Sequence, residues 1–94
     1  MFKRTVDEGM VAVTFSVPPE LGAREAYVVG SCTAWAEVPM NPCDDGSFEL
    51  VVELPAGQRH QFRYLLDGQR WENDWTADEY VPNAYGGDDS VVVT

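Results

Sequence analysis

Three segments of this chain place apolar side chains at every second position, and no segment of useful length shows the 3.6-residue period of a helix. The alternating segments are residues 11–17, 48–54 and 61–66. Because successive side chains of a strand point to opposite faces, each segment predicts a β-strand with one buried face. Turn signals recur about every ten residues, so the chain is predicted to form an all-β, immunoglobulin-like antiparallel β-sandwich of about seven short strands.

The rest of the chain supplies shorter elements and the domain boundary. Apolar runs at residues 26–30 and 90–94 predict two more strands, and residues 47–71 are typical of a three-strand meander. Residues 1–9 are charged and have neither period, so we expect a flexible N-terminal arm or a short edge strand there. Residues 10–94 then form a single domain.

Residues 72–89 are rich in Asp, Asn, Gly and aromatic residues and have no hydrophobic period. A loop of this length in a small domain is usually either functional or disordered. The aromatic residues Trp75, Tyr80 and Tyr85 favour order.

Trp71 lies on the return arm of a hairpin, and its orientation depends on the length of the Asp-Gly turn at residues 67–68. A two-residue turn pairs Trp71 with Tyr64 and points both side chains to the core. A three-residue turn places Trp71 on the outer face with Arg63 and Leu65, because a slip of one residue moves every side chain to the other face. The Asp-Gly dipeptide by itself favours the first register.

The charge balance and the apolar runs bound the expected partners. The chain has 16 acidic residues against 6 basic ones, a formal net charge of −10. This charge repels phosphates and anionic lipid headgroups, so neither nucleic acid nor a membrane surface is an expected partner. No apolar run has the length of a signal-peptide core or a membrane span, and we expect a cytoplasmic location, where Cys32 and Cys43 stay as thiols.

Residue types needed for catalysis or metal binding are sparse. His60 is the only histidine, so no Cys/His cluster is available for zinc, and no Asp-x-Asp-x-Asp-Gly loop offers a calcium site. The paired acidic residues lie in turn segments, where exposed polar side chains are usual. We therefore expect no metal site, no cofactor and no enzymatic activity.

Aromatic residues outside the predicted core indicate a binding surface. Trp35 and Trp75 lie in irregular segments and Trp71 lies in the hairpin, although each ring taken alone is as consistent with packing at the rim of the core. Arg63 and Asn83 are near these rings in sequence. An indole face beside hydrogen-bond donors suits a sugar, which has apolar C–H faces and polar hydroxyl edges.

Several short motifs follow one another in a specific order between residues 11 and 94. They are residues 28–30 followed by Trp35, then residues 39–40, 45–48, 54–57, 62–64, 67–68, 71–74 and 83–93. In order and spacing these motifs resemble the family 48 carbohydrate-binding modules, the α-glucan-binding early-set immunoglobulin-like sandwiches that precede the catalytic domains of isoamylases and glycogen branching enzymes. The chain is also similar to the glycogen-binding domain in the β subunit of AMP-activated protein kinase.

The resemblance implies a non-catalytic module that binds α-glucans of the glycogen or starch type. Trp35 and Trp71 match the tryptophans that stack on glucose rings, and Arg63 matches a basic residue that hydrogen-bonds sugar hydroxyls. Tyr85 matches an apolar residue that reaches round the glucan. Asp89 falls where the family often has an asparagine that hydrogen-bonds the sugar.

These implied roles also decide between the two hairpin registers. They require Trp71 to face solvent, so we predict the three-residue turn, with Gly68 in the left-handed position of a bulged turn. The chain departs from the family pattern in two places. Residues 30–35 read Gly-Ser-Cys-Thr-Ala-Trp where the family has Gly-Asp-Phe-Asn-x-Trp, and Trp75 replaces the usual proline after Asp74.

A second function belongs to a different class. The family's sandwich also docks against catalytic domains and kinase subunits. The alternative is therefore a protein-interaction or scaffold module that binds a glycogen-metabolism enzyme or a kinase, with weak or lost sugar binding.

Overall fold

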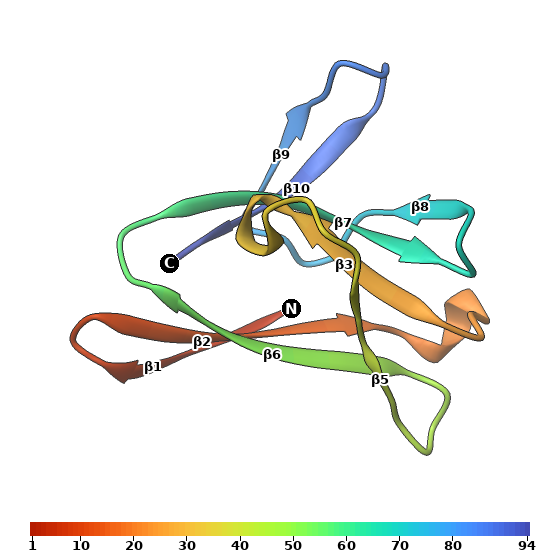
Figure 1. Cartoon of the computed structure of the whole chain (residues 1–94), viewed down its shortest axis with the longest axis horizontal. Coiled ribbons are helices and arrows are strands. Elements are labelled where there is room, and N and C mark those ends of the chain that lie inside the picture. The colour runs from red at the N-terminus through yellow and green to blue at the C-terminus, as the bar shows by residue number, and fades with distance from the viewer.

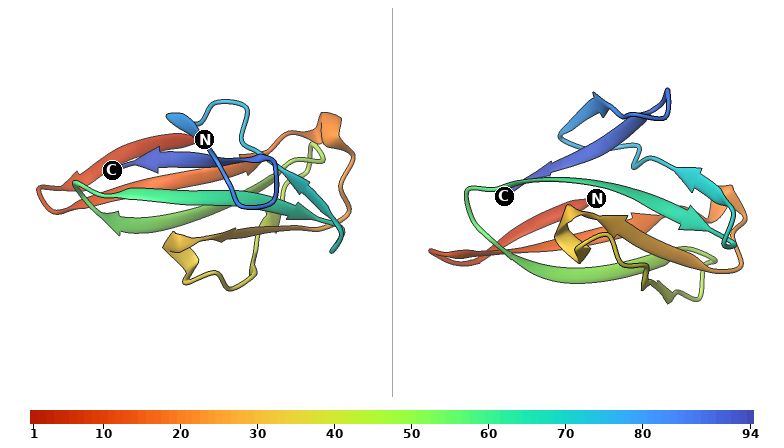
Figure 2. Two further views of the ribbon diagram at one scale, coloured as in Figure 1. Left: turned by 90° about the horizontal axis from the view of Figure 1, so that it is seen from above. Right: turned by 45° about the horizontal axis from the view of Figure 1, so that its top comes forward.

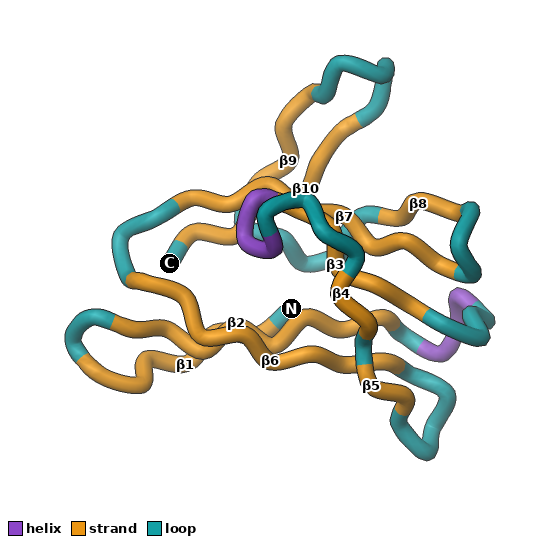
Figure 3. Tube along the Cα trace, viewed as in Figure 1, coloured by secondary structure: helices purple, strands orange, loops and turns teal.

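The computed structural model describes residues 1–94 and consists of short strands with two 3-10 turns (Figure 1, Figure 3). The strands are β1 (Phe2–Asp7), β2 (Met10–Val17), β3 (Ala26–Gly30), β4 (Val38–Pro39), β5 (Asn41–Pro42), β6 (Phe48–Pro55), β7 (Arg59–Leu66), β8 (Arg70–Glu72), β9 (Glu79–Pro82) and β10 (Asp88–Val93). The 3-10 turns are η1 (Pro19–Leu21) and η2 (Ser31–Thr33). None of these helical segments has the length or apolar character needed to cross a membrane.

The strands form two antiparallel sheets that pack face to face (Figure 2). The first sheet has the order β1-β2-β6-β5. The second has the order β4-β3-β7-β10-β9, and β8 also pairs with β7. The predicted immunoglobulin-like antiparallel sandwich is thus confirmed, with a larger number of strands because the irregular segments contribute very short ones.

The alternating positions of the sequence build the core between the two sheets. β7 turns Phe62, Tyr64 and Leu66 inward, and the edge of the Phe62 ring packs against Phe15 of β2 with 4.9 Å between ring centroids. The other members of the buried cluster are Val11, Val13, Val17, Ala26, Val28, Met40, Phe48, Leu54 and Val92. The period-two pattern therefore predicted correctly which face of β2, β6 and β7 is buried.

The predicted three-strand meander over residues 47–71 is wrong in its first half and confirmed in its second, the β7–β8 hairpin. β6 pairs with β2 and β5 in the first sheet, whereas β7 pairs with β3, β8 and β10 in the second. The turn after Pro55 carries the chain from one sheet to the other. Both strands have one strongly apolar face, and placing them in opposite sheets buries these faces against each other, an arrangement that the same turn residues permit as readily as a hairpin.

Two other segments decide between alternatives that the sequence left open. Residues 1–9 form the short edge strand rather than the flexible arm, since β1 pairs with β2 from Phe2 to Asp7. The segment of residues 72–89 is ordered and contains β9, which pairs with β10 in a hairpin that projects from the sandwich (Figure 1). Cys32 and Cys43 are free thiols, and burial raises the pKa of Cys32.

Candidate functional site

The β7–β8 hairpin has the register that exposes its tryptophan. Trp71 pairs with Leu65, which leaves residues 67–69 as a three-residue loop, and both Asp67 and Gly68 have positive φ. The prediction for Trp71 and for a left-handed Gly68 is therefore confirmed. Asp67 is a residue type that tolerates this conformation, and its carboxylate is held in place by backbone N–H groups from outside the hairpin.

The Asp67 contacts fix the hairpin to the neighbouring chain. The N–H groups of Arg24 and Glu25 donate to Asp67 Oδ1 over 2.7 and 3.0 Å. These two bonds lower the pKa of the Asp67 carboxyl below its ordinary value, because they favour the charged form. The turn that orients Trp71 is thus anchored at its tip.

Arg63 lies at the centre of the outer face of the second sheet, where β10 and β8 meet the same edge of β7. The pairing with β10 ends at Phe62 and the pairing with β8 begins at Tyr64. The Arg63 guanidinium lies over the Trp71 ring, 4.6 Å from its centroid, and its Nε is 3.1 Å from Asp89 Oδ1. A cation-π contact and an ion pair therefore hold one guanidinium between a ring and a carboxylate.

A turn attached to this cluster carries Tyr85. Asn83 organises the turn: its Oδ1 accepts the N–H groups of Tyr85 and Gly87, and its Nδ2 donates to Asp89 Oδ1 over 3.0 Å. The Tyr85 side chain is 89% exposed at the end of the β9–β10 hairpin. The loop that presents the most exposed aromatic ring is thus tied to the Arg63 ion pair.

Trp35 lies apart from this cluster, in the loop that follows η2. Its backbone N–H donates to the carbonyl of Gly30 over 2.8 Å, and its indole ring is 58% exposed. Ala34 and Trp35 both have positive φ, which is rare for residues with a Cβ and strained for a bulky one. The Thr33 hydroxyl closes the loop by bonding the backbone of Gly30 and Ala36.

Close contact between β3 and β7 sets the position of the Trp35 loop. A Cβ at Gly30 would lie 2.3 Å from the carbonyl oxygen of Gln61 and 2.7 Å from Phe62. Only glycine fits there, because the obstructing atoms include backbone that cannot move independently. The Ser31 hydroxyl then accepts the Gln61 N–H, so η2 is fixed against β7.

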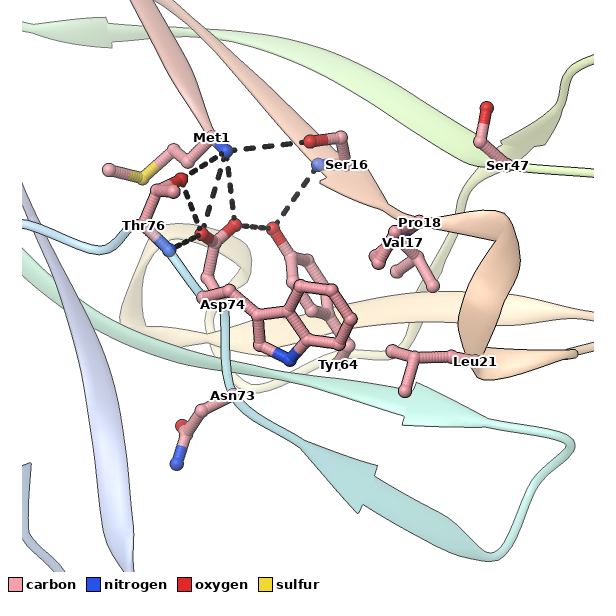
Figure 4. A pocket seen from close by; sticks show the side chains of 11 residues that line it. Met1, Ser16, Val17, Pro18, Leu21, Ser47, Tyr64, Asn73, Asp74 and Thr76 are labelled. Atoms are coloured by element: carbon pink, nitrogen blue, oxygen red, sulfur yellow. Dashed lines mark hydrogen bonds and ion pairs between the residues drawn. The ribbon is translucent and has the colours of Figure 1, made fainter. Parts of the chain in front are cut away.

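A separate cavity of about 190 Å³ lies beside Trp75, between the ends of the two sheets (Figure 4). Its polar end is the buried carboxylate of Asp74, which accepts bonds from the Tyr64 hydroxyl, from the N–H and hydroxyl of Thr76, and from the α-amino group of Met1. Burial next to this carboxylate raises the pKa of Tyr64. The remaining walls are mainly apolar and include Leu21.

The structure thus divides the predicted site residues into three positions. Arg63, Trp71 and Asp89 form one cluster, Tyr85 lies on the turn attached to it, and Trp35 lies in another loop at the end of β3. The sequence placed Asn83 near the aromatic rings as a donor but did not predict its bonds to Asp89 and to the Tyr85 turn, although an asparagine that opens a turn with two following glycines was a signal for the latter.

Residues 12–93 match the family model described as the glycogen recognition site of AMP-activated protein kinase. No curated protein sequence matches the chain. Because the family model spans nearly the whole sandwich, this chain belongs to the family of the AMP-activated protein kinase glycogen recognition site, whose members are non-catalytic carbohydrate-binding modules.

Proposed function

We propose that this protein binds glycogen-type α-glucans on the outer face of its second sheet, without catalysis. The observation that carries the proposal is the Trp71 indole, 44% exposed, with the Arg63 guanidinium held over one face of the ring. The ring supplies a stacking surface for the apolar face of a glucose unit. The N–H groups of the guanidinium supply donors for its hydroxyls.

Tyr85 and Trp35 extend the proposed surface in two directions. Tyr85 borders it from the β9–β10 turn. Leu65, which pairs with Trp71, also pairs with Tyr27 of β3. The backbone of Trp35 is hydrogen-bonded to Gly30, three residues further along β3, so it lies about 10 Å along the strand direction from the level of Trp71. A ligand that reaches both indoles is therefore an oligosaccharide chain rather than a single sugar.

The expected affinity is modest. If each indole removes about 100 Å² of apolar surface from water, stacking contributes about 2 to 3 kcal/mol per ring, and each hydrogen bond adds about 1 kcal/mol. Association costs at least about 4 kcal/mol. Dissociation constants between about 10 μM and 1 mM follow, which suits a polymer that repeats its epitope.

Affinity electrophoresis in gels containing glycogen tests the proposal, with maltoheptaose titration as a second measurement. The wild-type protein is expected to be retarded by glycogen, and Trp71→Ala is expected to migrate freely. A wild-type protein that runs unretarded at high glycogen concentration contradicts the proposal. Circular dichroism of the variant provides the control for folding.

The second candidate is a protein-docking module, and the Trp75 cavity favours it. The carboxylate and hydroxyl groups at its polar end are already bonded within the chain, so an occupant gains mainly apolar contacts. Such a site suits an apolar side chain of an enzyme of glycogen metabolism better than a sugar. A partner that remains bound to the protein after amylase treatment, and that Trp75→Ala releases, supports this candidate.

A further inference from the structure

Asp89 is poorly placed to contact a sugar, although it occupies a position that the resemblance assigns to sugar binding. Asp89 is only 6% exposed. One oxygen, Oδ1, accepts a hydrogen bond from Asn83 Nδ2 over 3.0 Å and is ion-paired with Arg63, 3.1 Å from its Nε. Two protein groups, the Arg63 guanidinium and the Asn83 amide, therefore already occupy Oδ1 of this carboxylate.

Asn83 joins this carboxylate to the turn through both ends of its amide. The Oδ1 accepts from Tyr85 N and Gly87 N over 2.9 and 3.2 Å, and the backbone N–H of Asn83 donates to the Gly87 carbonyl over 2.8 Å. A continuous path of contacts runs from the Tyr85 turn through Asn83, Asp89 and Arg63 to the Trp71 ring.

We propose that Asn83 and Asp89 are positioning residues that hold the Tyr85 turn and the Arg63 guanidinium in one arrangement, and that neither bonds the sugar directly. The inference rests on the glucan-binding function proposed above and deepens it. The physical reason is that Arg63 has a flexible side chain, and an ion pair at Nε fixes the plane of the guanidinium and leaves its terminal N–H groups for a ligand.

The two roles for Asp89 predict opposite results for Asp89→Asn. If the residue bonds the sugar, an asparagine restores the family's usual ligand and affinity for maltoheptaose rises. If it positions Arg63, the loss of charge loosens the guanidinium and affinity falls about fivefold, the loss expected for one hydrogen bond. Asp88→Asn is the matched control, because it removes the same charge from a neighbouring exposed side chain and leaves affinity unchanged.

Two substitutions at Asn83 separate its bonds within the Tyr85 turn from its bond to Asp89. Asn83→Asp keeps the acceptor for the two amides of the turn but replaces the donor to Asp89 with a repelling carboxylate. Asn83→Ala removes both. We expect each substitution to lower the affinity for maltoheptaose about fivefold. We expect Tyr85→Ala to cause little further loss of affinity in the Asn83→Ala background, whereas the two losses would add if the residues acted independently.

An NMR measurement without ligand keeps the two proposals distinguishable. In the wild-type protein the Arg63 Nε–H signal is expected to be protected from exchange, and the protection is expected to be lost in Asp89→Asn and kept in Asp88→Asn. Unprotected Nε–H in the wild type, or higher affinity in Asp89→Asn, overturns the positioning role. Protected Nε–H in a wild-type protein that does not bind maltoheptaose overturns the glucan-binding function, and the positioning role with it.

Discussion

Trp71 and Trp75 are four residues apart and both are exposed, yet their surroundings differ in chemistry. Trp71 lies on the outer face of a sheet beside a guanidinium. Trp75 lines a cavity whose buried carboxylate, Asp74, is bonded to Tyr64, Thr76 and Met1. Exposure of an indole does not by itself distinguish these two surroundings, and the proposal for Trp71 rests on the hydrogen-bond donors beside it.

The difference follows from which face of the sandwich each segment meets. β8 adds to the edge of the second sheet, so its alternation carries Trp71 to the outer surface. After β8 the chain turns inward, and the Asp74 N–H donates to the Ser90 hydroxyl over 2.9 Å. The polar groups there stabilise the junction between the two sheets, whereas the Arg63 side chain near Trp71 is 25% exposed.

The largest expected effect concerns the Trp75 region. Asp74→Ala leaves the buried Tyr64 hydroxyl without its acceptor and the Met1 amino group without its ion-pair partner, and removing one partner of a buried ion pair costs about 3 to 5 kcal/mol. Urea denaturation measures the loss. Tyr64→Phe removes one hydrogen bond only and is expected to lose about 1 to 2 kcal/mol. A loss below about 1 kcal/mol for Asp74→Ala would show that this region does not stabilise the sandwich.

The second prediction compares the two indoles in binding. Trp71→Ala is expected to weaken maltoheptaose binding about thirtyfold, which corresponds to about 2 kcal/mol of lost stacking. Trp75→Ala is expected to leave the affinity within about twofold of wild type, because its ring lies outside the proposed surface. Calorimetric titration measures both. Equal losses for the two variants would mean that the glucan spans both regions.

The third prediction concerns the strained loop of Trp35. Ala34→Gly relieves a positive φ without removing the indole, so the free energy of unfolding is expected to rise by about 0.5 to 1 kcal/mol with unchanged affinity. Trp35→Gly relieves strain in the same way but removes a proposed stacking ring. It is expected to keep its stability and lose affinity in the same titration. A Trp35→Gly variant with wild-type affinity would remove Trp35 from the proposed surface.

The smallest expected effect is a pH dependence that involves neither indole. Although desolvation raises the pKa of Asp78, bonds from Lys3 and from the Val93 N–H outweigh it and hold the pKa below its ordinary value of 3.8. A lowered folded-state pKa stabilises the protein above the unfolded value and the stabilisation is lost as pH falls through the folded value. Between about pH 5 and pH 2 the wild type is expected to lose stability more steeply than Asp78→Asn, by less than about 1 kcal/mol. Identical slopes would contradict the ion pair with Lys3.

Much of the fold was predictable because it depends on local patterns. The alternation in β2, β6 and β7 predicted their buried faces, and Gly68 together with the family's requirement for an exposed Trp71 predicted the hairpin register. The sheet assignment of β6 and β7 was not predictable. An apolar face shows that one side of a strand is buried, but it does not show which of the two sheets the strand joins.

The residues of the candidate site could be singled out from the sequence, but the contacts among them could not. Arg63, Trp71 and Asp89 were singled out from the sequence, and the structure gathers them. That Asp89 contacts Arg63 as well as Asn83 depends on how the β9–β10 hairpin lies against β7, because Arg63 is far from the other two residues along the chain.

The sequence by itself determined that this chain alternates into strands, turns at its Gly, Pro and Asp residues, and presents a surface suited to a neutral ligand rather than an anionic one. These properties reside in single residues and in their spacing. Only the tertiary structure decided that the polar groups near Trp75 are buried and bonded within the chain, while the Arg63 side chain over Trp71 is paired with Asp89 and stays 25% exposed. The reason is that the availability of a hydrogen-bonding group depends on all of its neighbours, and most of these come from distant strands.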